Sequence, residues 1–306
     1  MIQRVYMPSK DRKLLLHIAM LMLLSALIGG LFPLVKIAEQ SITPLTLAMS
    51  RSVLAAVVLL FVVGVGMKRN LAPLISQWRT YAILGALMST FFAAITMSEE
   101  YISASLASLL ACVIPISTFL IATLVLRWER FTLPRIGGAA LALAGVAMFI
   151  GLEKFQFDRA QLAGVAMIVC GYICYAGYIT YSRACELDPF VAATGTMVYI
   201  SLFLSVVAFT LEQPLQLHPG KDAILATFAI GAFSTVLTYV LLQYLIAHAG
   251  VVFAATSGYF IPLFAILASY FLVGETIGWL QVAGLGLTFV GAWLVNRNPE
   301  LGTAKL

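Results

Sequence analysis

Ten apolar stretches alternate with short polar connectors along the chain. They cover residues 14–35, 44–66, 80–98, 104–126, 134–151, 161–182, 189–211, 222–245, 250–272 and 278–295. Each has about the 20 residues that an α-helix needs to cross the hydrocarbon core of a bilayer. The pattern therefore predicts an all-α integral membrane protein with ten transmembrane helices and no soluble domain.

Two of these stretches begin with a helix-start signal. Thr43 precedes Pro44, and Asp188 precedes Pro189. A short polar side chain at the N-cap accepts hydrogen bonds from the first amides, and proline is tolerated at the first helical position. We therefore expect Thr43 and Asp188 to cap the second and seventh helices.

The composition agrees with a membrane protein. The chain is 62% hydrophobic and 10% charged, whereas a soluble domain is about 45–50% apolar and about 25% charged. The first apolar stretch exceeds the core of a signal peptide, about 7–15 residues, which favours a retained first helix. Cys170 and Cys174 lie one helical turn apart, but no cluster of histidines or further cysteines accompanies them, so we expect no metal and no cofactor.

Lysine and arginine are distributed unevenly between the two sides of the predicted bundle. Apart from Arg51, thirteen lie on the side of the N-terminus and four on the other side. Because basic residues gather in cytoplasmic loops, we expect the tails 1–13 and 296–306 to be cytoplasmic, in a chain of the inner, cytoplasmic membrane. No Lys/Arg-rich block accompanies the net charge of +5, so the expected partners are the lipid bilayer and a small molecule, not nucleic acid.

The two halves of the chain repeat the same pattern. Positions of the same residue type recur about 146 residues apart: Pro44 and Pro189, Pro115 and Pro262, Glu129 and Glu275, Gly138 and Gly284, Gly145 and Gly291. We therefore expect residues 14–151 and 161–295 to be two copies of a five-helix unit. Because five is odd, the second copy would enter the membrane inverted, as in many secondary transporters.

A glutamate after a long apolar helix, followed by a glycine-rich final helix, in both halves of the chain resembles the drug/metabolite transporter superfamily and, within it, the ten-helix EamA family. The segment PLTLAMSR, Pro44 to Arg51, is similar to the second helix of that family. The family often has a Trp-Gly pair in its first helix, where this chain reads SALIGG. The resemblance covers nearly the whole chain and implies a transporter of small organic metabolites, with export as the usual direction.

Pro115 and Pro262 fall near the middles of the fourth and ninth stretches. Each proline removes one helical hydrogen bond and frees the carbonyl four residues earlier, at Ala111 and Gly258. Broken helices at mid-depth are where transporters bind their solutes, although each proline could also be a simple kink.

Polar and aromatic side chains gather near these prolines. Together they suit a partly apolar solute such as an amino acid or a related amphiphile. The alternative is that Ser and Thr bond back to their own helix and that Tyr sits at the membrane interface. The candidate substrate-binding residues are Arg51, Thr96, Ser108, Pro115, Tyr172, Tyr175, Tyr239, Gln243, Ser257, Tyr259 and Pro262.

Arg51 lies about two turns inside the second helix, where an unpaired charge is costly. It could anchor a carboxylate of the solute. It could instead hold the structure together by bonding to carbonyls or to a nearby glutamate, Glu39, Glu99 or Glu100. The sequence favours the structural role and leaves both open.

Titratable groups for proton coupling are few. Glu99 and Glu100 end the third helix and could bind a proton at a gate, and His248 could titrate near neutral pH. Loop carboxylates are usually only solvated, so facilitated diffusion and exchange stay open.

The last helix of each half carries small residues at helical spacing, which lets helices approach closely in lipid. Gly284, Thr288 and Ala292 form one set, and Gly138 and Ala142 the other. They could pack within the bundle or between two copies, so a monomer and a homodimer are both compatible with the sequence. Glu129 and Glu275 are expected to act locally, as caps or ion-pair partners.

These features favour a secondary transporter whose two halves rock about a cavity at mid-depth. An importer or a facilitative exchanger is the first alternative. An integral membrane enzyme is less favoured, because the three histidines, at positions 17, 218 and 248, are scattered and no paired acidic motif accompanies them.

Overall fold

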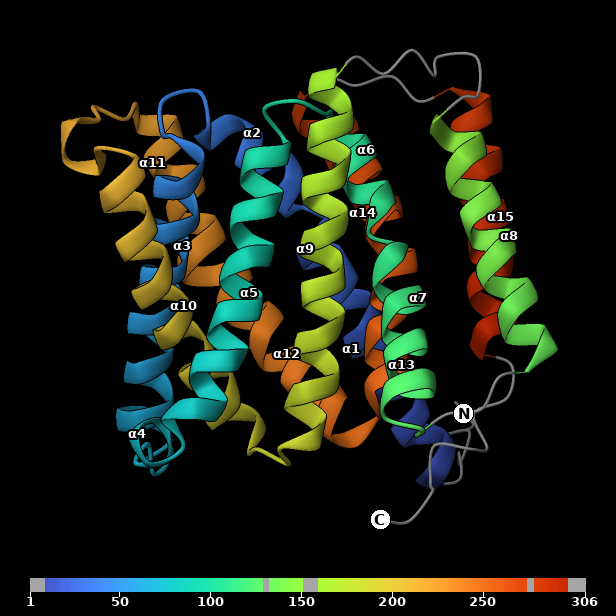
Figure 1. Ribbon diagram of the computed structural model, residues 1–306, viewed down its shortest axis with the longest axis horizontal. Helices are drawn as coiled ribbons and strands as arrows, with labels where there is room; N and C mark the ends of the chain where they lie inside the picture. Colours follow the sequence, from blue (N-terminus) through green and yellow to red (C-terminus); the bar gives the residue numbers. More distant parts are fainter. Residues whose placement is uncertain (1–8, 129–131, 151–158, 274–277, 297–306) are drawn as a thin grey trace, which may run out of the picture.

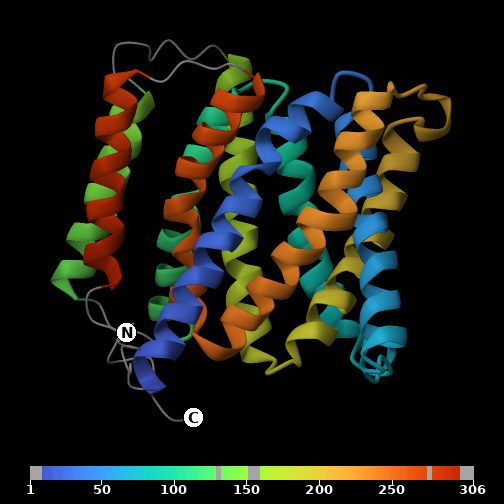
Figure 2. The same ribbon diagram turned by 180° about the vertical axis from the view of Figure 1, so that it is seen from behind.

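The computed structural model describes residues 9–128, 132–150, 159–273 and 278–296. All regular structure in these ranges is helical. The helices lie side by side and the chain reverses direction at successive loops (Figures 1 and 2). Glu129 and Glu275 lie outside the described residues, as do the connector 151–158 and most of both tails.

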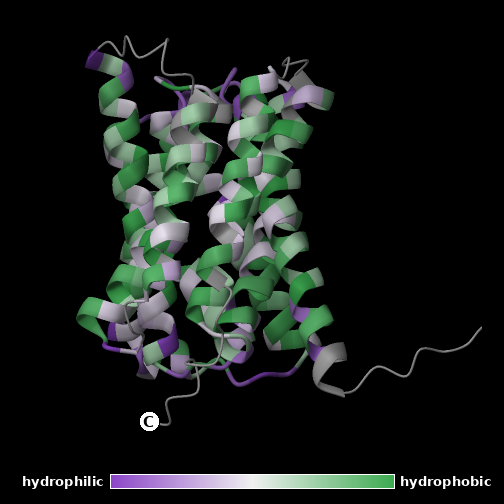
Figure 3. Cartoon of the chain, turned by 90° about the vertical axis from the view of Figure 1, so that its right-hand side faces the viewer, coloured by the Kyte–Doolittle hydropathy of each residue, from purple (hydrophilic) through white to green (hydrophobic). Residues whose placement is uncertain are grey.

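Apolar residues cover the middle of the bundle and polar residues gather near its two ends (Figure 3). Eight helices among the described residues are long and apolar enough to cross a membrane, and two shorter apolar helical stretches, Ile136–Gly145 and Val282–Val295, accompany them. The prediction of an all-α membrane protein is confirmed for the part of the chain that the structure describes.

The boundaries show more interruptions than the hydrophobic pattern predicted. In chain order the elements are α1 (Ser9–Gly29), α2 (Leu31–Ala38), α3 (Pro44–Leu59), η1 (Leu60–Gly66), α4 (Pro73–Ser76), α5 (Trp78–Ser98), α6 (Ala104–Leu110), α7 (Val113–Leu120), η2 (Ile121–Val125), α8 (Leu133–Ile150), α9 (Arg159–Ala184), α10 (Pro189–Leu211), η4 (Pro214–Gln216), α11 (Lys221–Phe228), η5 (Ala229–Thr235), α12 (Val236–His248), α13 (Val251–Ala255), α14 (Ser257–Val273) and α15 (Trp279–Asn296).

The first predicted helix is broken at Gly30, between α1 and α2. Pro33 follows the break and has no amide hydrogen to donate to the carbonyl four residues earlier, at Gly29. The break was not predicted. It tilts α2 over the end of the bundle where α3 begins (Figure 2).

The breaks near the two repeated prolines lie ahead of the prolines themselves. The fourth predicted helix breaks at Ala111 and Cys112, where the Ala111 carbonyl accepts from the Ile114 amide at 3.0 Å. The ninth breaks at Thr256, and Pro262 lies inside α14. The prolines therefore mark the interrupted helices correctly. The first break includes the predicted Ala111, and the second, at Thr256, lies two residues before the predicted Gly258.

The two interrupted helices cross each other at Gly258. A Cβ atom on this glycine would lie 2.6 Å from the carbonyl oxygen of Ala111 and 2.8 Å from Cδ of Pro115. The Gly258 carbonyl in turn lies 3.9 Å from Sγ of Cys112, which donates to it. The carbonyls that were expected to face a solute thus take part in a packed junction.

Helices α8 and α15 form a close pair at one side of the bundle (Figures 1 and 2). A Cβ on Gly138 would lie 2.7 Å from the Gly291 carbonyl, and a Cβ on Gly145 would lie 2.5 Å from the Gly284 carbonyl. Thr288 Oγ1 donates to the Gly284 carbonyl at 3.0 Å. The predicted small-residue faces therefore pack against each other within one chain. We call this contact the α8–α15 seam.

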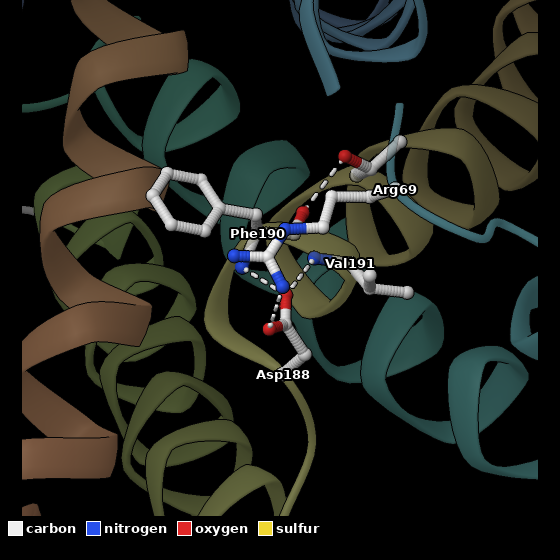
Figure 4. Close-up of polar contacts among 5 residues, drawn as sticks. Arg69, Asp188, Phe190 and Val191 are labelled. Carbon is white, nitrogen blue, oxygen red and sulfur yellow. Dashed lines mark hydrogen bonds and ion pairs between the residues drawn. The ribbon is translucent and has the colours of Figure 1, made fainter. Parts of the chain in front are cut away.

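Helices α3 and α10 are joined at both ends by carboxylates. Asp188 accepts from the amides of Phe190 and Val191, both at 3.1 Å, and its Oδ2 lies 3.4 Å from Nη1 of Arg69, which follows η1 (Figure 4). The predicted cap of α10 is confirmed.

At the other end of the pair, Thr43 makes no side-chain hydrogen bond to the first amides of α3. Glu212, directly after α10, accepts from the amides of Leu45 and Thr46 at 3.0 and 2.7 Å, and also from the Thr43 hydroxyl. Thr43 is the N-cap residue of α3, as predicted, but the prediction that its side chain accepts from the first amides is wrong, because the Glu212 carboxylate accepts from two of them.

Candidate functional site

A buried cavity lies in the middle of the bundle. Segments far apart in the sequence supply its apolar lining: Ile28, Leu31, Phe32 and Val35 from α1 and α2, Ile95 from α5, Ile114 from α7 and Ile261 from α14. The interrupted helices thus contribute isoleucines to the cavity, while Pro115 and Pro262 are buried in the helices beside it.

Aromatic rings form one wall of this cavity. Phe91 of α5 packs against Tyr175 and Tyr172 of α9, with ring centroids 4.7 and 5.8 Å apart. Phe92 meets Tyr239 of α12 edge-on at 6.1 Å. Because aromatic faces accept flat or apolar groups and cations, this wall suits the organic part of a solute.

Arg51 of α3 brings a positive charge to the cavity. Its side chain is 2% exposed, and Nε and Nη2 have no hydrogen-bond partner. The guanidinium carbon lies 4.0 Å from the centre of the Phe92 ring. Arg51 takes part in none of the ion pairs among the described residues. The structural role that the sequence favoured, a bond to carbonyls or to a glutamate, is not seen in this part of the chain.

Glu99 brings a carboxylate to the same cavity. It directly follows α5, is 1% exposed, and neither carboxylate oxygen has a hydrogen-bond partner. Lys36 bonds to the backbone carbonyl of Glu99 and not to its side chain. Burial raises the pKa of Glu99 well above its usual range, and the neighbouring carboxylate of Glu39 acts in the same direction.

Four hydroxyls beside these charges also lack partners, namely those of Tyr175, Thr235, Thr238 and Tyr239. Tyr172 differs, because its hydroxyl donates to the Ala107 carbonyl at 2.7 Å. Buried polar atoms in native proteins nearly all have a partner. Eight of the sixteen unpartnered buried side-chain atoms found among the described residues line this one cavity, and this concentration favours a site that polar groups of another molecule complete.

The cavity is nearly closed. The free space at its centre measures about 30 Å³, which is room for water molecules, whereas pockets for organic ligands measure about 300–1,000 Å³. An organic solute therefore requires the surrounding helices to move apart.

A second hollow opens at the end of the bundle where α2 ends and α3 begins. We call it the carboxylate groove, and it is lined by Lys36, Glu39, Gln40, Ser41, Ile42, Thr43, Pro44, Glu99 and Glu100. Burial raises the pKa of Glu39 to about 7, although Lys36, whose Nζ lies 3.9 Å from its Oε2, acts in the opposite direction. Glu99 lines both the groove and the central cavity.

The predicted substrate-binding residues separate into two groups. Arg51, Tyr172, Tyr175 and Tyr239 line the cavity. The remaining predicted residues lie outside its lining: Thr96, Ser108, Pro115, Gln243, Ser257, Tyr259 and Pro262.

Several residues outside the lining have local partners instead. Thr96 and Ser257 bond back to the carbonyls of Phe92 and Ala254. Gln243 accepts from Ser182 at 2.9 Å and donates to Tyr178 at 2.6 Å. Tyr259 packs among Leu109, Cys112, Ala142 and Ile266.

The three predicted proton sites also differ. Glu99 is buried at the cavity, whereas Glu100 is exposed in the groove. His248 is exposed at the opposite end of the bundle, where its ring stacks on Tyr244 at 4.1 Å and Nδ1 lies 2.9 Å from the Tyr244 carbonyl oxygen. Phe91, Phe92 and Thr235 line the cavity and were not predicted, because nothing in their own segments distinguishes them from core residues.

A multi-pass helical bundle that encloses a nearly closed, mostly apolar cavity with a buried arginine and glutamate in its wall is typical of a membrane transporter. The chain matches the EamA-like transporter family over residues 15–151 and again over residues 162–297. It belongs to this family, as the resemblance in its sequence implied, and it is a transporter.

The names of relatives agree with this assignment, and one solved structure shares the fold. An uncharacterized transporter of Archaeoglobus fulgidus is 23% identical over 88% of this chain and 95% of the relative. The probable terminal-alkyne amino-acid exporter of Streptantibioticus cattleyicolor is 25% identical over 87% of this chain and 89% of that relative. The uncharacterized inner membrane transporter YedA of Escherichia coli K12 is 25% identical over 90% of this chain and 89% of that relative. A protein of known crystal structure shares the fold, with a TM-score of 0.73 at 15% identity over 90% of this chain and 95% of that one.

Proposed function

We propose that the protein exports a small organic solute with an anionic group, such as an amino acid or a related amphiphile, by alternating access about the central cavity. The observation that carries this proposal is Arg51, a buried guanidinium with two unpartnered nitrogens at a cavity wall. An uncompensated charge inside a membrane protein is costly and marks a functional site. A carboxylate can pair with a guanidinium through two parallel hydrogen bonds, which would remove that cost.

The rest of the cavity fits the rest of such a solute. Phe91, Phe92 and Tyr175 offer ring surface to an apolar side chain, and the free Tyr239 hydroxyl offers a hydrogen bond. The name of one relative, the probable terminal-alkyne amino-acid exporter, is consistent with this solute class and with the direction of transport.

The proposal includes ten membrane helices in two inverted repeats, 14–151 and 161–295. The two family matches fall close to these halves. The α8–α15 seam supports the repeat further, because Gly138 packs on Gly291 and Gly145 packs on Gly284. In the repeat, Gly138 corresponds to Gly284 and Gly145 corresponds to Gly291. The two contacts are therefore equivalent with the halves exchanged, as a two-fold relation between repeats requires.

We further propose that both tails face the cytoplasm, as the distribution of lysine and arginine predicts, and that the membrane is the inner one, as the name of the YedA relative states for that protein. The carboxylate groove then opens to the outside. The protein would be a carrier and not an enzyme, so the solute would leave chemically unchanged.

The test begins with a thermal-shift screen of the purified protein against amino acids, amines, purines and aromatic drugs. A compound that binds the native state raises the melting temperature. We expect acids with an apolar side chain to do so. We also expect Arg51→Gln to bind them about 10–100-fold more weakly, since hydrogen bonds to charged groups contribute about 1.5–3 kcal/mol.

Arg183→Gln is the matched control, because Arg183 is exposed and donates to the Ala247 carbonyl away from the cavity. Equal binding by wild type and Arg51→Gln would refute the role of Arg51. Vesicles containing the protein then distinguish the classes, because a carrier moves the compound unchanged and an enzyme converts it.

A further inference from the structure

Glu99 lies between the central cavity and the carboxylate groove. Among the described residues, it alone lines both the central cavity and the carboxylate groove. Its side chain is 1% exposed, and both carboxylate oxygens lack a hydrogen-bond partner. Nothing in the proposed binding of a solute to Arg51 uses this group.

The surroundings of Glu99 leave its charge uncompensated. Lys36, the nearest cation on α2, bonds to the backbone carbonyl of Glu99. The charged groups that act on the Glu99 carboxyl are Glu39, next to the end of α2, which disfavours the ionised form, and Lys36 of α2 and Arg51 of α3, which favour it. Glu100 of the same loop acts on Glu39, and Glu99 itself acts on Tyr172 of α9. No ion pair joins any described cation to the Glu99 carboxylate.

An ionised carboxylate without partners is costly inside a protein, whereas the neutral acid is tolerated. The closed cavity in this structure is therefore compatible with a protonated Glu99. After loss of the proton, the carboxylate is stable only if water solvates it. The groove can supply this water, because Glu99 already lines it and it opens to solvent.

We propose that Glu99 is a proton-binding site of this transporter and that release of its proton into the carboxylate groove opens the central cavity toward that groove. The step is one acid dissociation, in which the carboxylic acid becomes a carboxylate and the proton passes to water in the groove. Uptake of a proton from the same water reverses the step and allows the cavity to close.

Coupling of this step to solute movement rests on the proposed function. If the groove faces outside, an open groove releases the solute outward, and the proton taken up from outside closes the cavity before it turns inward. Because the proton leaves to the groove and returns from the groove, no proton crosses the membrane in this cycle, and the step controls when the cavity opens without driving export by a proton gradient.

The test measures the width of the groove without any solute. Spin labels on Gln40→Cys, in the groove lining, and Tyr101→Cys, directly after Glu100 of that lining, report the distance by pulsed electron spin resonance; both positions are exposed. The four native cysteines are first replaced by alanine. We expect this distance to increase by several ångströms as the pH rises past neutrality.

Glu99→Gln should abolish the increase, because glutamine is a neutral mimic of the protonated acid. Glu100→Gln is the matched control and should keep the increase, since Glu100 is exposed. A label pair at the opposite end, Ser76→Cys and Ala184→Cys, should show no widening with rising pH.

Three results would overturn the proposal: a groove distance independent of pH, a widening that persists in Glu99→Gln, or a narrowing with rising pH, which would indicate that the ionised carboxylate pairs with Arg51. If Glu99→Gln does not fold, Glu99→Asp decides. If the groove of Glu99→Asp widens with a midpoint at a different pH from that of the wild type, the proposal is supported. If the midpoint pH is unchanged, the proposal is refuted. Because no solute is present, these results are independent of whether Arg51 binds a carboxylate.

Discussion

The α8–α15 seam and the central cavity are both buried, yet they are built in opposite ways. In the seam, small residues bring two backbones into contact, and the Thr288 hydroxyl bonds to the Gly284 carbonyl. Around the cavity, large side chains meet, and Arg51 and Glu99 both have polar atoms without partners.

This difference distinguishes a contact that stabilises the fold from a site that serves transport. Close contact with satisfied polar groups stabilises a helix pair in lipid. Unsatisfied polar groups do the reverse, so they persist where binding or transport requires them. Four changes test this difference, and we expect their effects to decrease from the first to the last.

The first prediction fills the seam. In Gly291→Leu the new Cβ would lie 2.5 Å from the Ala142 amide nitrogen and from the Gly138 carbonyl oxygen. Overpacking costs about 1–3 kcal/mol and more where backbone must move, so we expect at least about 3 kcal/mol and little monodisperse protein. Gly286→Leu is the control, because its site has open space. Equal yields and melting temperatures of the two variants would contradict the prediction.

The second prediction makes the cavity resemble a packed core. Arg51→Met keeps much of the side-chain volume and removes the buried charge. Replacing buried charges by apolar residues is often stabilising by about 1–4 kcal/mol, so the melting temperature should rise while binding of acids is lost. A fall in melting temperature of similar size would show that Arg51 holds the structure together. Arg79→Met, at an exposed position, controls for loss of charge.

The third prediction uses pH, which acts on the groove beside the cavity and not on the seam contacts of glycine and threonine. Burial raises the pKa of Glu39 from 4.5 to about 7, so the folded state holds this proton more tightly than the unfolded state. Its contribution to stability is therefore fully present below about pH 4.5 and is lost as the pH rises through about 7.

Thermal melts across this range should show a loss of about 3 kcal/mol, since each unit by which the pKa of Glu39 is raised corresponds to about 1.4 kcal/mol. The loss should be much smaller in Glu39→Gln and only slightly smaller in Glu100→Gln, because the Glu100 charge contributes less than burial to the raised pKa of Glu39. A stability that increases from acid to neutral pH in wild type and not in Glu39→Gln would reverse the assigned sign.

The fourth prediction compares two tyrosines in the same wall. Tyr172→Phe leaves the Ala107 carbonyl without its donor and should cost about 1 kcal/mol. Tyr175→Phe removes a hydroxyl that has no partner and should leave stability nearly unchanged while weakening solute binding. Melting temperatures of the two variants, measured together, check the order.

Local features of the sequence were sufficient to predict much of this architecture. Helices in lipid follow from long apolar runs, because the bilayer allows little else, and the cap at Asp188 depends only on residues two and three positions away. The glycine faces of α8 and α15 were also visible as small residues at helical spacing.

Features that depend on distant segments were not predictable in this way. The cap of α3 joins residues up to 169 positions apart. Phe91 and Phe92 lie in an apolar run that looks like any core, and only the positions of α9 and α12 make them cavity walls. Two nitrogens of Arg51 lack a hydrogen-bond partner because of how the neighbouring helices pack. The sequence around Arg51 could therefore not decide whether it binds a carboxylate of the solute or holds the structure together.

The carboxylate of Glu212 on the first turn of α3 has a consequence for biogenesis. The ribosome must synthesise and release a large part of the second half of the chain before α3, inserted much earlier, receives its cap. A fragment that ends before residue 212 should therefore leave the start of α3 open to proteases, and co-expression of the missing part should protect it.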